Sequence, residues 1–303
     1  MKTLLQQKPA PHWRTALLGV LAALLCCIAP AALSQPAPKK IVIGLLPEMN
    51  IFRQKERFEP LEEYLTRKLG IPVQFTILAR YSNIIDRFTA DRLDGAFFGS
   101  FTGAIAIRKL GVVPLARPVN EDRTSTYQGY LFVRRDGGIT SVSAMKGKRM
   151  AFVDKATTAG YLFPLAWLKE NGIPSPEGFF GEQFFTGSHD AAVSAVLNGK
   201  ADIGAAKNTV YEQLRKEDPR VDQELVILAR SALVPSNGLC VRKDLDPSVR
   251  KALQEALLGL GRDPGGKQVL SSMGAIGFIE TTIQDYTPVF ELARSAGLDI
   301  STY

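Results

Sequence analysis

Hydrophobic and polar positions divide the chain from residue 40 onward into short strands and amphipathic helices. Short apolar runs predict strands, and the apolar positions between them repeat with helical spacing. Alternation of strand and helix at this pace is typical of a mostly parallel sheet covered by helices on both faces. The pattern begins again near residue 148, which predicts a second unit of the same kind, with helices at 158–171 and 189–197. The predicted strands span residues 40–46, 73–77, 94–99, 148–153, 179–185 and 201–206.

The order of these elements predicts two α/β lobes joined by two chain crossings. The chain leaves the first lobe near Tyr127 and returns near Ser231. We therefore expect lobe 1 to be discontinuous, with residues 35–127 and 231–303, and lobe 2 to span residues 128–230. Two crossings form a hinge, and hinged lobes bind a ligand between them and close on it.

The N-terminal segment, residues 1–34, has the composition of a secretory signal peptide. Basic residues without any acidic residue precede an apolar run at 16–29, and small residues follow, ending at Ser34. An uncleaved membrane anchor is the alternative, but the run is shorter than the ~20 residues that cross a bilayer. We expect cleavage near Ser34 and a periplasmic mature protein.

Charge and residue counts exclude several classes of function. Removing residues 1–34 takes away three of the 37 Lys and Arg residues, which leaves 34 against 30 acidic residues and a net charge of about +4. No basic cluster interleaved with aromatic residues points to nucleic acid. His12, His189 and the lone later cysteine, Cys240, offer no metal spacing or disulfide, so we expect no cofactor and a Cys240 that fills the core.

A loop that opens a helix at Thr157-Thr158-Ala159-Gly160 has the composition of an oxyanion site. The first amides of a helix have no acceptor within the helix, and the helix dipole is positive at that end. Two hydroxyl groups and two small residues add donors and room, which favours a phosphate-like group. Threonine is also a routine helix cap, so a purely structural role stays open. The spacing of a nucleotide P-loop is absent.

His189 opens the next predicted helix, after the turn Thr186-Gly187-Ser188. A histidine near a helix start is often structural. Its position in a second turn between strand and helix favours a role as a donor to an oxyanion. Protonation near pH 6–7 would then strengthen that contact.

These motifs, together with the segments at 94–99, 146–148 and 199–204, occur in an order and spacing that resemble the PhnD-like phosphonate-binding periplasmic proteins of ABC importers. The resemblance extends from about residue 40 to residue 300. It implies the type II periplasmic-binding-protein fold, with two mixed-sheet α/β domains joined by a two-segment hinge.

The resemblance also implies site residues. The family's Ser-Thr-Ser-Gly loop falls on residues 157–160, with Ala159 in place of a hydroxyl, and its ligand-contacting histidine falls on His189. Its two cleft tyrosines fall on Tyr81 and Tyr127.

Two departures from the family pattern bear on the ligand. The family's Gly-Pro-x-x-Tyr turn is Gly99-Ser100-Phe101-Thr102-Gly103 here, so Ser100 stands in the place of the proline. Where many relatives offer an acidic residue to a ligand amine, this chain has Lys207-Asn208. We expect these residues to contact the ligand, and we infer that an aminoalkylphosphonate is not that ligand.

The function that follows is the periplasmic solute-binding component of an ABC importer. It would capture a small oxyanion, phosphonate-, phosphite- or phosphate-like, and deliver it to a membrane permease. A periplasmic sensing module that partners a membrane kinase is the alternative. Because no nucleophile, histidine and carboxylate set is evident, we do not expect an enzyme. We expect a monomer.

Overall fold

The computed structural model describes residues 40–303. The predicted signal peptide, residues 1–34, and its cleavage near Ser34 lie outside the described residues. Residues 40–303 belong to one compact unit that contains two main sheets.

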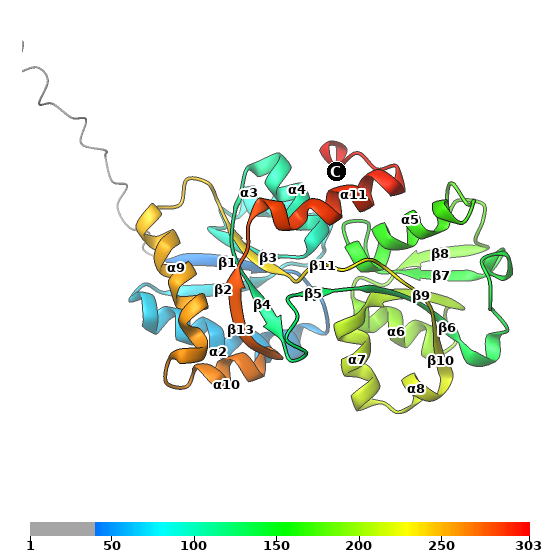
Figure 1. The fold of residues 1–303 in the computed structure, drawn as a ribbon, viewed down its shortest axis with the longest axis horizontal. Helices are drawn as coiled ribbons and strands as arrows, with labels where there is room; N and C mark the ends of the chain where they lie inside the picture. Colours follow the sequence, from blue (N-terminus) through cyan, green and yellow to red (C-terminus); the bar gives the residue numbers. More distant parts are fainter. Residues whose placement is uncertain (1–39) are drawn as a thin grey trace, which may run out of the picture. The chain divides into compact units, whose positions relative to one another are not determined.

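Lobe 1 is built on a six-stranded mixed sheet with the strand order β13-β4-β12-β3-β1-β2 (Figure 1). β1 pairs in parallel with β2 and β3, whereas β12 lies antiparallel between β3 and β4. The sheet therefore combines strands from both ends of the described chain. Its strands are β1 (Ile41–Leu45), β2 (Val73–Ile77), β3 (Gly95–Phe98), β4 (Val113–Asn120), β12 (Gly238–Val241) and β13 (Ala275–Glu280).

Lobe 2 is built on a five-stranded mixed sheet with the order β10-β6-β9-β7-β8. β7 pairs in parallel with β8 and β9, and β6 lies antiparallel between β9 and β10. The expected α/β class with two mixed sheets is confirmed. The strands are β6 (Gly129–Arg134), β7 (Arg149–Phe152), β8 (Glu182–Phe185), β9 (Ile203–Lys207) and β10 (Leu225–Arg230).

The helices begin and end where local chemistry requires it. The side chain of Asp246 accepts from the backbone amides of Ser248 and Val249 at the start of α9, and a left-handed Gly70 ends α2. In lobe 1 and the C-terminal part the helices are α2 (Ile51–Leu69), α3 (Ile84–Ala90), α4 (Ser100–Leu110), α9 (Pro247–Gly259), α10 (Gly266–Ser272) and α11 (Thr287–Ala296). In lobe 2 they are α5 (Phe163–Glu170), α6 (His189–Leu197), α7 (Asn208–Glu217) and α8 (Arg220–Glu224).

The helix predicted at 158–171 is interrupted at its start. A π-helical turn, η3 (Thr158–Leu162), precedes α5, so the first bonds of the segment join residues five apart. A Cβ atom on Gly160 would lie 2.5 Å from Val153, so only glycine allows η3 to approach the end of β7 so closely. Wide turns of this type are frequent at functional sites.

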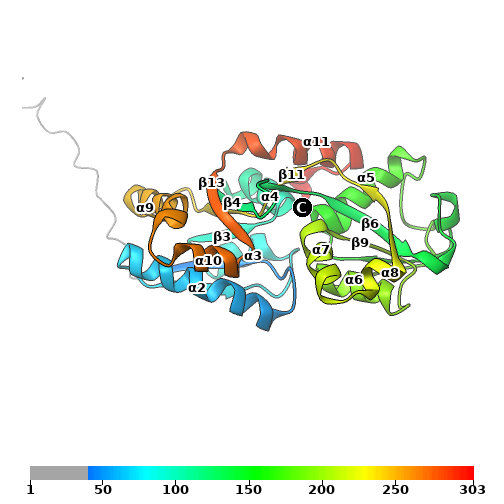
Figure 2. The same ribbon diagram turned by 60° about the horizontal axis from the view of Figure 1, so that its bottom comes forward.

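Two short strands join the lobes. β5 (Thr126–Tyr127) and β11 (Val234–Pro235) pair antiparallel, so the outgoing and returning segments lie side by side (Figure 1). The C-terminal helix α11 contacts both α4 of lobe 1 and α5 of lobe 2 (Figure 2). Part of residues 231–303, which we assigned to lobe 1, therefore also packs against lobe 2. The lobe boundaries given above stay a prediction.

One hydrophobic cluster extends through the region where the lobes meet. It includes Phe98 and Phe101 from lobe 1 and Val153 and Leu162 from lobe 2, all almost completely buried. Cys240 belongs to the same cluster and is fully buried, which confirms that it is a core residue. The packed cluster fixes the turns that precede α4 and η3 relative to each other.

Candidate functional site

Most of the site residues predicted from the sequence line one small cavity where the two lobes meet. Its volume is about 10 Å³, which is room for about one water molecule. The cavity lies beside the starts of α4, η3 and α6, each of which follows a strand. The lining residues are Glu48, Tyr81, Gly99, Phe101, Thr102, Tyr127, Ala156, Thr157, Thr158, His189, Lys207 and Asn237.

Two helix starts meet across this cavity. The backbone amide of Phe101, in the first turn of α4, donates to the Thr158 hydroxyl oxygen at 2.9 Å. Thr158 is itself the first residue of η3 and is 4% exposed. The amides at both helix starts carry a positive partial charge, and the Thr158 oxygen is the acceptor that lies between them. An oxyanion oxygen fits that same position chemically.

The other three residues of the predicted loop have different surroundings. The Thr157 hydroxyl lines the cavity but donates to the backbone carbonyl of Asp154 at 2.6 Å. Ala159 and Gly160 do not line the cavity. Both residues lie where η3 packs closely on its neighbours. Gly160 packs against Val153, and the backbone of Ala159 packs against Gly129. The size of these two residues therefore serves packing, whereas we expected it to make room for a ligand.

His189 is the first residue of α6, and its backbone amide and its ring each make a hydrogen bond. Its backbone amide donates to the Glu48 carbonyl at 3.2 Å, and its Nδ1 atom accepts from the Lys207 amide at 3.2 Å. Burial lowers the pKa of His189 to about 4. The ring is therefore neutral at pH 7, and because Nδ1 is an acceptor the proton lies on Nε2. The expected protonation near pH 6–7 is corrected: His189 offers a neutral donor.

Lys207, at the end of β9, is paired with an acidic residue that the sequence analysis did not identify. Its Nζ atom donates to Glu48 Oε1 at 2.7 Å and to Asn237 Oδ1 at 3.2 Å, and lies 4.7 Å from the centre of the Tyr127 ring. Burial would raise the pKa of Glu48, but the charges of Lys207 and Arg57 outweigh that effect and lower it to about 2. The expected attraction of Lys207 for an anion is therefore largely balanced by Glu48.

The two predicted tyrosines differ in how their hydroxyl groups are satisfied. The Tyr127 hydroxyl lies 3.0 Å from that of Ser100, which in turn donates to the Pro235 carbonyl at 2.7 Å. Ser100 thus supports Tyr127 from behind and does not line the cavity. The Tyr81 hydroxyl is buried and, within residues 40–303, has no hydrogen-bond partner. Such a group costs about 1–3 kcal/mol, so it marks a place where a ligand acceptor fits.

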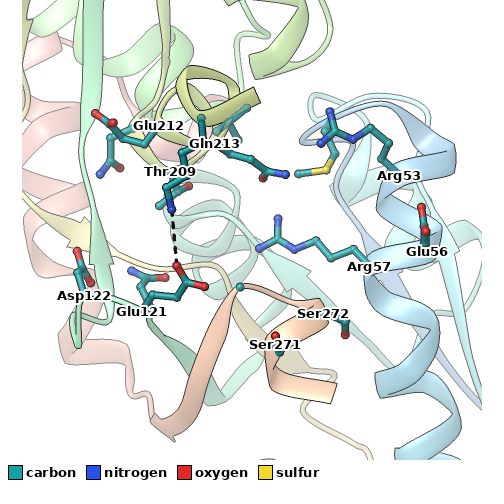
Figure 3. Close-up of a pocket in the computed structure, with 16 residues that line it drawn as sticks. Arg53, Glu56, Arg57, Glu121, Asp122, Thr209, Glu212, Gln213, Ser271 and Ser272 are labelled. Carbon is teal, nitrogen blue, oxygen red and sulfur yellow. Dashed lines mark ion pairs between the residues drawn. The ribbon is translucent and has the colours of Figure 1, made fainter. Parts of the chain in front are cut away.

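Asn208 lies outside the predicted site. Its side chain accepts from the Gln128 amide at 2.9 Å, and the residue lines a much larger pocket, of about 620 Å³, bordered by α2, α7 and α10. Figure 3 shows Arg53 and Arg57 extending into this pocket from α2. Glu121, which also lines the pocket, forms an ion pair with Lys216. Arg53 pairs with Glu217 at 2.6 Å and Arg57 donates to the Met273 carbonyl. The basic groups of this pocket therefore already have partners.

Sequence reasoning missed Glu48, Asn237 and the Phe101 amide. Glu48 follows β1 at the carboxyl end of a parallel strand, which is where ligands bind in open α/β sheets, so a signal for it existed. The Gly99-Ser100 turn could have revealed the Phe101 amide as the start of a helix after a strand. Asn237 lies between β11 and β12, and nothing local in the sequence distinguishes it.

The donor set at the cavity is chemically uniform. It offers backbone amides, hydroxyl groups, a neutral imidazole and one ammonium, all of which donate to an oxygen-rich anion. Within the described part of the chain, no group of three or more His, Cys, Asp and Glu side chains is arranged to hold a metal ion. Among residues 40–303, no helix combines the length and the apolar character that a bilayer crossing needs.

A small cavity with a polar lining where two α/β lobes meet is the arrangement of a two-lobed ligand-binding protein. Residues 43–286 match the family model described as ABC transporter, phosphonate, periplasmic substrate-binding protein. The chain belongs to this family, and the resemblance drawn from its motifs is confirmed. It is a substrate-binding component of an ABC importer, and its family is periplasmic.

Individual relatives are distant but cover most of the chain. The phosphate-import protein PhnD of Mycolicibacterium smegmatis is 28% identical over 222 residues, which are 70% of this chain and 69% of that protein. A binding-protein component of a phosphonate ABC transporter from Pseudomonas aeruginosa has a TM-score of 0.79 at 22% identity, covering 85% of this chain and 86% of that one. PhnD1 of Prochlorococcus marinus, solved with methylphosphonate, has a TM-score of 0.76 at 23% identity, covering 86% and 99%. These similarities confirm the two-lobed type II fold.

Proposed function

We propose that this protein captures a small tetrahedral oxyanion, a phosphonate, phosphite or phosphate, between its lobes and delivers it unchanged to a membrane permease. The observation that carries the proposal is the meeting of two helix starts at Thr158 and the Phe101 amide. Each helix start contributes a partial positive charge of about half a unit, and the two lie on different lobes. An anion between them therefore holds the lobes together.

The contacts around the cavity support closure as the mechanism. In addition to the bond between Phe101 and Thr158, the Asn50 amide donates to Asp190 at 3.1 Å and the Ser82 hydroxyl donates to Asp154 at 3.2 Å. These bonds join lobe 1 to lobe 2 at residues next in the chain to His189 and Tyr81, which line the cavity. Closure by such bonds removes the ligand from water, which strengthens every polar contact to it. The closed form is then the shape that a permease recognises.

The size of the cavity indicates which contacts the ligand replaces. A volume of about 10 Å³ is too small for a tetrahedral oxyanion, so some contacts must give way when one binds. The Phe101 amide is bonded to a neutral hydroxyl, and a charged acceptor forms a stronger bond with the same amide. We therefore propose that an anion oxygen replaces the Thr158 hydroxyl as the acceptor of the Phe101 amide, while the Thr158 hydroxyl turns to donate to the anion.

Isothermal titration calorimetry of the purified protein with phosphate, phosphite, methylphosphonate and 2-aminoethylphosphonate tests the proposal. We expect micromolar or tighter binding of at least one of the first three. We expect weaker binding of the aminoethyl compound, because Glu48, the acidic residue that lines the cavity, is already paired with Lys207 and leaves no net negative charge for its amine. Thr158→Ala should weaken binding by about 1.5–3 kcal/mol, or roughly 10- to 150-fold, because a donor to a charged group is lost.

Thr209→Ala is the matched control, since Thr209 lines the larger pocket beside α7 and is not among the residues that line the small cavity. Equal affinities for wild type and Thr158→Ala would remove the site assignment. No binding of any of the four anions would remove the oxyanion proposal. We also propose that the mature protein is a monomer that begins after Ser34, which N-terminal sequencing and light scattering of the exported protein test.

A further inference from the structure

A carboxylate lines the cavity that we assign to an anion. Glu48 borders the same small cavity as Tyr81, Thr158 and His189, and its side chain is only 12% exposed. Its Oε1 atom accepts from Lys207 Nζ at 2.7 Å and from Asn237 Nδ2 at 3.0 Å. Both bonds go to Oε1, which leaves Oε2 free to accept from another donor.

The groups that face Glu48 come from four elements. Lys207 at the end of β9 contacts it directly, Arg57 on α2 adds a more distant positive charge, and His189 on α6 is neutral at pH 7. Burial raises the pKa values of Tyr127, on β5, and of Tyr81, which precedes α3, so both tyrosines are neutral too. The carboxylates of Asp154 and Asp190 are not among the residues that line the cavity, and their charges act on Tyr81.

The charges at the cavity therefore balance without a ligand. Lys207 is the single cation among the residues that line the cavity, and Glu48 neutralises it. A doubly charged oxyanion would meet a carboxylate in a place with little water, where like charges repel each other strongly. A singly charged oxyanion that keeps one proton can instead donate an O–H···O⁻ hydrogen bond, which is among the shortest and strongest in proteins.

We propose that Glu48 determines specificity by accepting a hydrogen bond from a protonated oxygen of the bound oxyanion. The site then takes the hydrogen-bearing monoanions of phosphite, phosphonates and phosphate, and rejects sulfate, which carries no proton near neutral pH. This inference rests on the proposed function and adds the protonation state of its ligand.

Calorimetry on the unmodified protein provides the first test. Phosphite is titrated at about pH 8, where it is mostly a dianion, in buffers with different ionisation enthalpies, which reveals the protons taken up on binding. We expect an uptake close to one proton. The apparent affinity should rise as the pH falls through the second ionisation of phosphite and then level off. Because the pKa values of His189 and Glu48, about 4 and about 2, lie well below this range, neither residue accounts for the change.

Titration with sulfate shows whether the proton is taken up by the ligand or by a residue of the protein. Wild type should bind sulfate at least about tenfold more weakly than phosphite, because sulfate cannot donate to Glu48. If His189 took up the proton instead, sulfate would bind with the same proton uptake and the proposal would be overturned. Comparable affinities for sulfate and phosphite without proton uptake would overturn it as well.

Glu48→Gln provides the second test, since its amide keeps the shape of the side chain and its oxygen can still accept from Lys207. Proton uptake should be lost, and the ratio of phosphite to sulfate affinity should fall by about tenfold or more. Glu217→Gln is the control, because it removes another ion pair between the lobes, with Arg53, that lies outside the cavity. That variant should keep both the proton uptake and the ratio.

The two proposals fail in different ways. If none of the oxyanions binds wild type, the proposed function is wrong. If phosphite binds but the wild-type protein takes up no proton, only the role of Glu48 is wrong. The wild-type measurements decide this even if Glu48→Gln does not fold.

Discussion

The neutral state of His189 predicts a loss of stability in mild acid that one substitution should remove. His189 is 4% exposed and is the only histidine in residues 40–303. Its pKa is lowered by burial from 6.5 to about 4. Between these values the unfolded chain binds a proton that the folded protein does not bind. The free energy of unfolding must therefore fall as the pH is lowered through this range.

The size of the effect follows from the two pKa values. Each pH unit between the two pKa values lowers the free energy of unfolding by about 1.4 kcal/mol, and pH 5 lies about 1.5 units below the pKa of the unfolded histidine. The loss between pH 7 and pH 5 is therefore about 2 kcal/mol, and it reaches roughly 3 kcal/mol by pH 4. Carboxylates contribute little above pH 5, because their ordinary pKa values lie near 4.

Urea unfolding without added ligand at pH 7, 6 and 5 measures the effect. Wild type should lose about 2 kcal/mol over this range, whereas His189→Asn should lose almost none. Asparagine keeps an acceptor for the Lys207 amide but does not titrate, so the comparison concerns the slope and not the absolute stability. A wild-type slope equal to that of the variant would refute a buried, neutral His189.

Four further substitutions, in two matched pairs, test the tyrosine hydroxyl groups at the site and the packing of the fold. Tyr81→Phe should weaken oxyanion binding without lowering the free energy of unfolding of the ligand-free protein, because the buried Tyr81 hydroxyl has no partner among residues 40–303. Tyr127→Phe should lower that free energy, because the Tyr127 hydroxyl lies beside Ser100, and calorimetry with urea unfolding checks both variants. Gly103→Ala should cost about 1–3 kcal/mol, because its Cβ would lie 2.6 Å from the buried ring of Tyr286. Gly259→Ala, with no neighbour closer than 4.0 Å, should be neutral or stabilising, and equal melting temperatures for the two alanine variants would contradict this.

Local patterns predicted elements well and pairing partners less well. The strand at 73–77 and the helix at 189–197 have the bounds expected from apolar periodicity, because that period is set within each segment. The position of β12 between β3 and β4 depends on contacts with residues far away in the sequence, such as Cys240 with Ala96. Nothing within residues 238–241 encodes that register. The π-helical start of α5 likewise depends on Val153 packing against Gly160.

The same division holds at the site. Thr158 and His189 could be predicted because the turn between a strand and a helix is a local pattern with a known electrostatic consequence. Ala159 and Gly160 belong to the same turn, but their roles depend on which neighbours pack against them. Glu48 is 159 residues away from Lys207, and only the folded chain brings the two charges within 2.7 Å. The sequence alone therefore could not support the inference that the charge of Lys207 is free to attract an anionic ligand.

The pairing of Glu48 with Lys207 changes which groups attract the anion. Because these two side chains balance each other, the field that favours an anion comes from the helix starts at Phe101 and Thr158, and these amides do not titrate. Tyr81 and the neutral His189 add donors that are uncharged as well. A site of this kind gains little from extra negative charge on the ligand, and it selects by the number and position of acceptors and by the presence of a proton. The discrimination between phosphite and sulfate therefore depends on one carboxylate, whereas the affinity for both depends on the backbone.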